Sequence, residues 1–276
     1  MSAKTDRRKF LAKALALTSA MSLPFVSKSQ DSLLDEGRPL PSLKGRKVLF
    51  TYGGWDGHEP QKFVDYLTPW LKGEGADVVA FNSLEPYTDK ALMNSIDLVL
   101  QIFTMAKITK EQEAGLLEAI AKNGTGMAGW HGGMCDAFRD NVDYQFMTGG
   151  QWVAHPGGVI DYEIEIIDQR DALTKGLRKF SMKSEQYYMH VDPNVKVLAT
   201  TKFNGAIHPW IDGAVIPVTW KKMYGKGRIF FTSVGHNLNH VTEKPEAIEM
   251  IKRGIKWASA SKYEPAEKWL SPVYKT

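Results

Sequence analysis

The chain has 276 residues, of which 43% are hydrophobic, 11% aromatic and 24% charged, a composition typical of a globular protein and not of a disordered one. The single cysteine, Cys135, excludes a disulfide framework and any cysteine-based zinc or iron–sulfur site. Residues 1–30 hold six basic side chains and one acidic one, which leaves 29 basic and 30 acidic side chains in the rest of the chain. The net charge of +4 therefore belongs to the N-terminus and argues against a nucleic-acid partner.

The N-terminal thirty residues have the pattern of an export signal. Arg7 and Arg8 precede Phe10 and Leu11, and the apolar stretch 12–26 is too short and too polar for a transmembrane helix. Paired arginines followed by x-Phe-Leu resemble the twin-arginine signal, whose machinery exports folded proteins. We therefore predict a periplasmic or secreted protein that uses this machinery and has no integral membrane span; a basic N-terminus that is disordered or amphipathic is the alternative.

The rest of the chain predicts one α/β domain. Residues 31–44 are polar and contain prolines, so we expect a linker there, followed by a domain over 45–262 and a C-terminal tail at 263–276. Apolar runs predict strands at 47–52, 77–81, 97–103, 125–130, 159–167, 195–200, 215–220 and 228–232, and helical spacing predicts helices at 60–72, 110–122 and 245–260. Their alternation predicts a mostly parallel sheet with helices on both faces.

Four histidines stand close to glycines in the sequence. His58, His131 and His236 follow the carboxyl ends of predicted strands, and His155 follows the glycine pair 149–150. Ligands of open parallel sheets bind at the carboxyl ends of the strands, and glycine lets a ligand approach the backbone closely. The pattern predicts a polar pocket that these histidines share.

Three runs carry a family resemblance: Gly-Gly-Trp-Asp-Gly-His at 53–58, Trp-His-Gly-Gly at 130–133 and Gly-Gly-Gln-Trp-Val-Ala-His-Pro at 149–156. Together with 173–177, Glu-Gln-Tyr at 185–187 and 225–236, they resemble the ThuA-like (trehalose utilisation) family over about 46–260. The resemblance implies a flavodoxin-like fold of the class I glutamine amidotransferase-like type. It also implies a role in sugar catabolism, commonly beside dehydrogenases that make 3-keto sugars.

Two positions depart from the patterns that the resemblance implies. Amidotransferases present a cysteine nucleophile at an elbow after a strand, whereas this chain has His131 there, which argues against amidotransferase chemistry. Cys135 lies four residues further on, so an amidase or peptidase that depends on Cys135 is kept as a third hypothesis. The frequent Asp-Glu-x-Tyr of the family is Ser184-Glu185-Gln186-Tyr187 here, which keeps the glutamate and loses its acidic neighbour.

The chemistry of 3-keto sugars indicates which residues carry the reaction. A proton must leave the carbon beside the carbonyl, for which histidine and carboxylate are suited, and a divalent metal would stabilise the enolate as a Lewis acid. We therefore predict an exported carbohydrate-active enzyme, a hydrolase, lyase or isomerase, with His131, His236 and Glu185 as catalytic residues. A non-catalytic sugar-binding module that uses the same pocket is the second hypothesis.

Further residues are candidates for binding the substrate or a metal. We expect substrate contacts from Trp55, Asp56, His58, Trp130, Trp152, His155 and Tyr187. If a divalent metal binds, its candidate ligands are His131, His155, His236 and Glu185. The sequence leaves the oligomeric state open, a homo-oligomer included.

Overall fold

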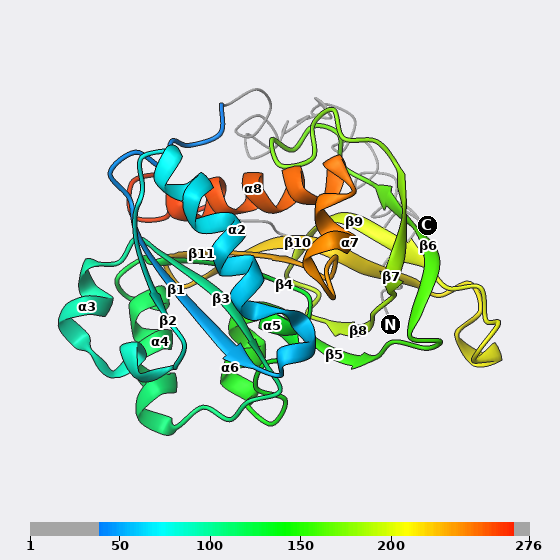
Figure 1. The fold of residues 1–276 in the computed structure, drawn as a ribbon, viewed down its shortest axis with the longest axis horizontal. Coiled ribbons are helices and arrows are strands. Elements are labelled where there is room, and N and C mark those ends of the chain that lie inside the picture. The colour runs from blue at the N-terminus through cyan, green and yellow to red at the C-terminus, as the bar shows by residue number, and fades with distance from the viewer. Residues whose placement is uncertain (1–38, 268–276) are drawn as a thin grey trace, which may run out of the picture. The chain divides into compact units, whose positions relative to one another are not determined.

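A computed structural model describes residues 39–267, which belong to one of the two units into which the chain divides, residues 35–276 (Figure 1). The predicted signal segment at 1–30 and the end of the predicted tail, 268–276, lie outside the described residues. Of the predicted linker, only residues 39–44 are described, and there Leu43 is buried in the hydrophobic core.

A nine-stranded sheet runs through the described residues in the order β2-β1-β3-β4-β11-β10-β9-β6-β7. Its first five strands pair in parallel: β2 (Asp77–Phe81), β1 (Lys47–Gly54), β3 (Leu98–Thr104), β4 (Gly126–Trp130) and β11 (Gly227–Thr232). In chain order these are strands 2-1-3-4-5, the flavodoxin-like arrangement. The predicted fold class, α/β with a flavodoxin-like sheet, is confirmed.

The other strands form an antiparallel extension. It consists of β10 (Val215–Tyr224), β9 (Lys196–Lys202), β6 (Val159–Ile166) and β7 (Phe180–Glu185), while β5 (Gly150–Ala154) and β8 (Tyr188–Val191) make a small sheet of their own. All eight predicted strands and three predicted helices are present, with ends that differ by four residues at most. The sequence did not predict β5, β7 or β8, because they are short and hold no continuous apolar run.

Helices cover both faces of the sheet (Figure 1). One face packs against α2 (Pro60–Gly73) and α8 (Pro245–Ser259), and the other against α3 (Lys90–Ser95), α4 (Lys110–Ala121) and α6 (Val142–Thr148). Val48 and Phe50 of β1 point into the first core, and Leu49 between them points into the second. The parallel strands are therefore apolar on both faces, which explains why continuous hydrophobic runs predicted them.

Short helical elements lie in the connections between the strands and the longer helices. They are η2 (Asp56–His58), η3 (Glu85–Thr88), α5 (Gly132–Cys135), η4 (Pro209–Ile211) and α7 (Leu238–Thr242). Although β7 is the far edge strand of the sheet, the Ser184 hydroxyl at its end donates a 2.7 Å hydrogen bond to the carbonyl of Gly235, which follows β11. This bond brings the end of β7 to the carboxyl ends of the parallel strands. Among residues 39–267, no helix combines the length and apolarity that crossing a membrane requires.

Candidate functional site

Four polar side chains meet at the carboxyl ends of the parallel strands. His58 lies in η2 directly after β1, His131 follows β4, His236 follows β11, and Glu185 is the last residue of β7. One ligand atom from each of the four lies within 4.8 Å of the others. We call these four residues the His/Glu cluster; it unites three of the four glycine-flanked histidines with the glutamate to which the family resemblance pointed.

The carboxylate of Glu185 is the centre of the cluster. Its Oε2 atom lies 3.1 Å from His131 Nε2, 3.2 Å from His236 Nδ1 and 3.9 Å from His58 Nε2. Burial alone would raise the pKa of Glu185, but the surrounding histidines outweigh burial and hold the pKa far below its usual value. Glu185 is therefore ionised at neutral pH and accepts hydrogen bonds without donating any.

Oxygen atoms behind two of the rings fix their orientation. Nδ1 of His131 lies 2.8 Å from the Ser233 carbonyl, which can only accept, so Nδ1 carries the proton and Nε2 faces Glu185. Burial lowers the pKa of His131 to about 3, although its contact with Glu185 acts in the opposite direction. Nδ1 of His58 lies 2.8 Å from the Thr104 hydroxyl. Nε2 of His58 and Nδ1 of His236 are buried and have no hydrogen-bond partner.

Backbone strain concentrates around the cluster. Among residues 39–267, the only non-glycine residues with positive φ are Glu59 (49°), Met105 (50°), His131 (48°) and His236 (81°). Two of them are cluster members, Glu59 follows His58, and Met105 follows Thr104. Non-glycine residues hold such angles only where the surrounding structure imposes them, and such positions gather at functional sites.

Two glycines let the histidine rings pack closely. A Cβ atom on Gly132 would collide with the ring of His58, and one on Gly235 would collide with the ring of His131. Both positions therefore require glycine, because the histidine rings approach the backbone too closely for a side chain. This close approach is the reason for which we expected glycine beside functional groups.

Aromatic and basic side chains surround the His/Glu cluster. Trp55 is 44% exposed, and its ring centroid lies 4.7 Å from that of His58. His155 is half-exposed, with Nε2 3.8 Å from Oε1 of Glu185. Trp152 is partly buried, and the guanidinium of Arg139 lies over one of its faces at 4.3 Å. Tyr187 is buried and stacks on His131 with the ring centroids 4.0 Å apart.

Some of the sequence candidates lie elsewhere. Trp130 is buried in the core and packs against Phe50 and Phe63, so it has no open face for a sugar, and this expectation is corrected. Asp56 is exposed in η2, and it is Thr104 that hydrogen bonds to His58. Burial raises the pKa of the Cys135 thiol well above its usual value, the opposite of an activated nucleophile.

Sequence reasoning missed several neighbours of the cluster. The buried, apolar strand β3 ends at the polar residue Thr104, a sequence signal that could have identified it. Ser233 contributes its carbonyl, for which no side-chain pattern exists. The ring of His240, which was not among the sequence candidates, stacks near that of His236 with the centroids 5.6 Å apart, and its Nδ1 atom lies 3.0 Å from the Ser184 hydroxyl.

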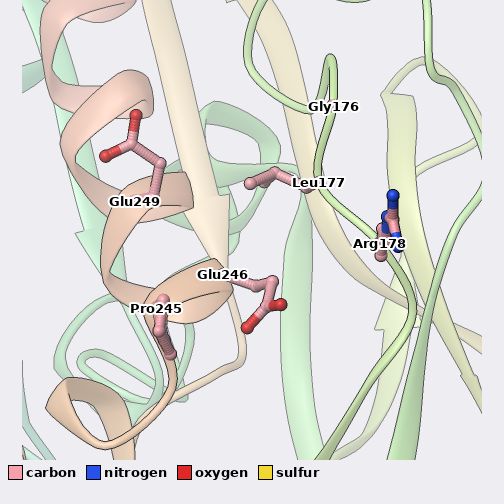
Figure 2. A pocket seen from close by; sticks show the side chains of 6 residues that line it. All are labelled: Gly176, Leu177, Arg178, Pro245, Glu246 and Glu249. Atoms are coloured by element: carbon pink, nitrogen blue, oxygen red, sulfur yellow. The ribbon is translucent and has the colours of Figure 1, made fainter.

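A separate surface pocket of about 420 Å³ lies between the loop at 176–178 and the start of α8 (Figure 2). Its lining residues are Gly176, Leu177, Arg178, Pro245, Glu246 and Glu249. None of them was a candidate in the sequence, and none belongs to the His/Glu cluster.

Comparisons with known proteins agree with this fold. A ThuA-like protein from Bacteroides uniformis has 15% identity and a TM-score of 0.66, with 80% of this chain and 94% of that chain covered. A ThuA-like protein from Parabacteroides merdae has 20% identity and a TM-score of 0.61, covering 84% and 98%. A cytoplasmic protein from Salmonella typhimurium has 12% identity and a TM-score of 0.55, covering 78% and 98%. A search of curated proteins gives no match.

The sequence itself settles the family. The family model described as ThuA, trehalose utilisation, matches residues 47–258, which is most of the chain and includes all four members of the His/Glu cluster. The chain therefore belongs to the ThuA, or trehalose utilisation, family.

Proposed function

We propose that this protein is an enzyme that acts on glycosides or their 3-keto derivatives, with the His/Glu cluster as its reaction centre. Membership of the trehalose utilisation family supports a carbohydrate-related role. The observation that carries the proposal is the convergence of three imidazoles on one buried carboxylate at the carboxyl ends of the strands, where ligands of this fold class bind.

The environment of each residue suggests its part in the reaction. A carboxylate with a strongly lowered pKa is a weak base, and the buried ring of His131, with a pKa of about 3, is a weak base too. Neither is therefore suited to remove a proton from carbon. His155 is half-exposed beside the cluster, and we assign the proton transfer to it.

The substrate would enter past Trp55, whose exposed ring offers a face to the apolar side of a sugar. Its keto oxygen would lie beside the imidazoles of the His/Glu cluster, and a divalent cation held there would offset the negative charge that develops on the enolate oxygen. Loss of the proton beside the carbonyl can then lead to elimination of the glycosidic oxygen, to hydrolysis or to isomerisation.

Export by the twin-arginine route is also part of the proposal. It rests on Arg7, Arg8, Phe10 and Leu11 alone.

A proton NMR time course of the purified protein with a 3-keto-disaccharide and a divalent metal tests the reaction. We expect new sugar resonances or solvent exchange beside the carbonyl, lost in His131→Ala and reduced at least tenfold in His155→Ala. His190→Ala, which alters an exposed histidine on β8, is the matched control and keeps the wild-type rate. An unchanged spectrum with saturable line broadening would replace the enzyme by a sugar-binding module, and no effect of any kind would reject the substrate class.

A further inference from the structure

The His/Glu cluster turns acceptor atoms toward one another. The Ser233 carbonyl holds the proton of a neutral His131 ring on Nδ1, so Nε2 presents a lone pair to the ionised Glu185, 3.1 Å away. Two lone pairs at this distance repel each other unless a positive charge lies between them. Such an arrangement is stable if the ring is protonated or if a cation binds both atoms.

Two further nitrogens point to the cation. Nε2 of His58 and Nδ1 of His236 are buried without a hydrogen-bond partner, although both belong to the cluster. Burying a polar atom without a partner costs free energy, and unsatisfied atoms of this kind are rare in native proteins. A single ion in the middle of the cluster would give each of them a partner.

The spacing of the atoms fits such an ion. Ligands bound tetrahedrally at about 2.1 Å from a metal lie about 3.4 Å from one another. The distances from Oε2 of Glu185 to the ring nitrogens of His131, His236 and His58 are 3.1, 3.2 and 3.9 Å. These three distances lie on either side of that spacing, and one ligand atom from each of the four residues lies within 4.8 Å of the others.

The atoms behind the rings complete the arrangement. Histidines that bind metals almost always direct their other ring nitrogen to a carbonyl, carboxylate or water, which fixes the tautomer. His131 does so through the Ser233 carbonyl, while Nδ1 of His58 faces the Thr104 hydroxyl, which can either donate or accept. Two of the three histidines therefore have the outer partner that metal binding requires.

We propose that His58, His131, His236 and Glu185 together bind one divalent transition-metal ion through three nitrogens and one oxygen. Imidazole ligands favour zinc, iron, cobalt or nickel over calcium and magnesium, which prefer oxygen. His155 stays outside the ligand set, because its Nε2 atom approaches the other carboxylate oxygen and its side chain is half-exposed. The role of the ion in catalysis rests on the proposed function. If the protein acts on a 3-keto sugar, the ion would polarise the keto oxygen while His155 moves the proton.

Metal binding is measured directly on the full chain. Protein freed of metal by a chelator is titrated with Zn²⁺ by calorimetry, and with Co²⁺ by visible absorption, which reports histidine ligation without any substrate. We expect one ion per chain. Saturation at about 100 times the dissociation constant raises the midpoint of thermal unfolding by about 5–10 °C. A chain that binds no ion at micromolar concentrations overturns the proposal.

Variants identify the ligands. Removal of an outer partner of a metal ligand lowers metal affinity by about 10–100-fold. We expect His58→Ala and Glu185→Gln, which remove ligands themselves, to lower the affinity for Zn²⁺ by more than this. His155→Ala and the control His190→Ala, at an exposed position on β8, keep the stoichiometry and affinity of the wild type. If His155→Ala abolishes binding and His58→Ala does not, the proposed ligand set is wrong.

Thermal unfolding of the metal-free protein distinguishes the proposed metal site from the alternative, in which protonated histidines surround Glu185 as their counter-ion. In the proposed site, Glu185→Gln supplies an amide proton to His131 Nε2, so the metal-free variant unfolds at the same or a higher temperature than the metal-free wild type. In the ion-pair cluster the same change removes the counter-ion and lowers the midpoint, which would overturn the proposal. None of these measurements uses a sugar, so their outcome is independent of whether the proposed reaction occurs.

Discussion

Thr104 and Ser233 decide which ring nitrogens face the centre of the His/Glu cluster. The Thr104 hydroxyl lies at 2.8 Å from Nδ1 of His58, and the Ser233 carbonyl at 2.8 Å from Nδ1 of His131. Each oxygen leaves Nε2 of its histidine directed at Glu185. The chemistry of the cluster therefore depends on residues that themselves do not touch the carboxylate.

Replacing Thr104 by valine tests this dependence at the scale of a single residue. Thr104→Val keeps the shape of the side chain and removes the oxygen, so the ring of His58 loses the hydrogen-bond partner that holds its orientation. We expect the affinity for Zn²⁺ to fall by about 10–100-fold, as measured by calorimetry. Thr104→Ser keeps the hydroxyl and restores most of the affinity; if valine and serine behave alike, the hydroxyl does not orient His58.

At the scale of elements, the turn from β4 into α5 positions His131 in the His/Glu cluster. The side chain of Gln101 supports this turn from behind, with its amide nitrogen donating to the Gly133 carbonyl at 3.1 Å and to the Tyr144 hydroxyl at 2.7 Å. The Tyr144 hydroxyl in turn donates to the Met134 carbonyl at 3.0 Å. These buried bonds help to keep His131 in its positive-φ conformation.

Gly132→Ala tests whether the turn must pack this closely. The new Cβ would collide with the ring of His58, so either the ring or the turn has to move. We expect unfolding to become easier by about 1–3 kcal/mol, and turnover to fall by about 100-fold, since displacements near 1 Å have this effect in active sites. Denaturant titration and the NMR assay measure the two quantities.

The control for this change is Gly73→Ala, at the end of α2. A Cβ atom at Gly73 meets no other atom within 4 Å, so this variant keeps both activity and stability. Wild-type turnover in Gly132→Ala would mean that His58 need not lie where the structure has it.

The scale of elements also shows what the sequence can predict. β1 and β3 are apolar on both faces, so their runs are recognisable without tertiary information. β7 alternates buried and exposed residues over only six positions, and β8 has four residues. Such strands are defined by their partners across the sheet, and no local pattern identifies them.

In the candidate site, too, the sequence predicts what depends on local patterns and misses what depends on tertiary structure. His58, His131 and His236 were found from a local pattern, because each follows a strand end beside glycine. The sequence put His155 and not His58 among the candidate metal ligands, since it could not tell which ring enters the cluster. That choice depends on the turn of η2 and on Thr104, more than forty residues away in the sequence.

At the scale of the whole molecule, a buried network of charges joins the antiparallel half of the sheet to residues 264–267. Asp171 precedes β7, is fully buried and lies 2.8 Å from both Lys196 on β9 and Lys221 on β10. Arg228 on β11 pairs with Glu264 at 2.9 Å and with Glu267 at 3.1 Å. The guanidinium of Arg228 therefore binds carboxylates of its own chain.

Asp171→Asn removes the central negative charge of this network. Two lysines then lose a buried partner, and the free energy of unfolding at pH 7 should fall by about 3–5 kcal/mol, measured by denaturant titration. Glu118→Gln, which breaks the exposed pair with Lys122 on α4, is the control and leaves the midpoint nearly unchanged.

The effect of Asp171 should depend on pH in a defined direction. Burial would raise the pKa of its carboxyl, but Lys221 and Lys196 outweigh burial and hold it well below its usual value in the folded chain. A carboxyl with a lowered folded pKa stabilises the protein above its unfolded pKa of about 3.9, and this stability is lost as the pH falls further toward the folded value. The gap in stability between wild type and Asp171→Asn should therefore be constant from pH 7 to 5 and narrow below pH 4. A gap that widens with acidity would mean that Asp171 is not the ionised centre of the network.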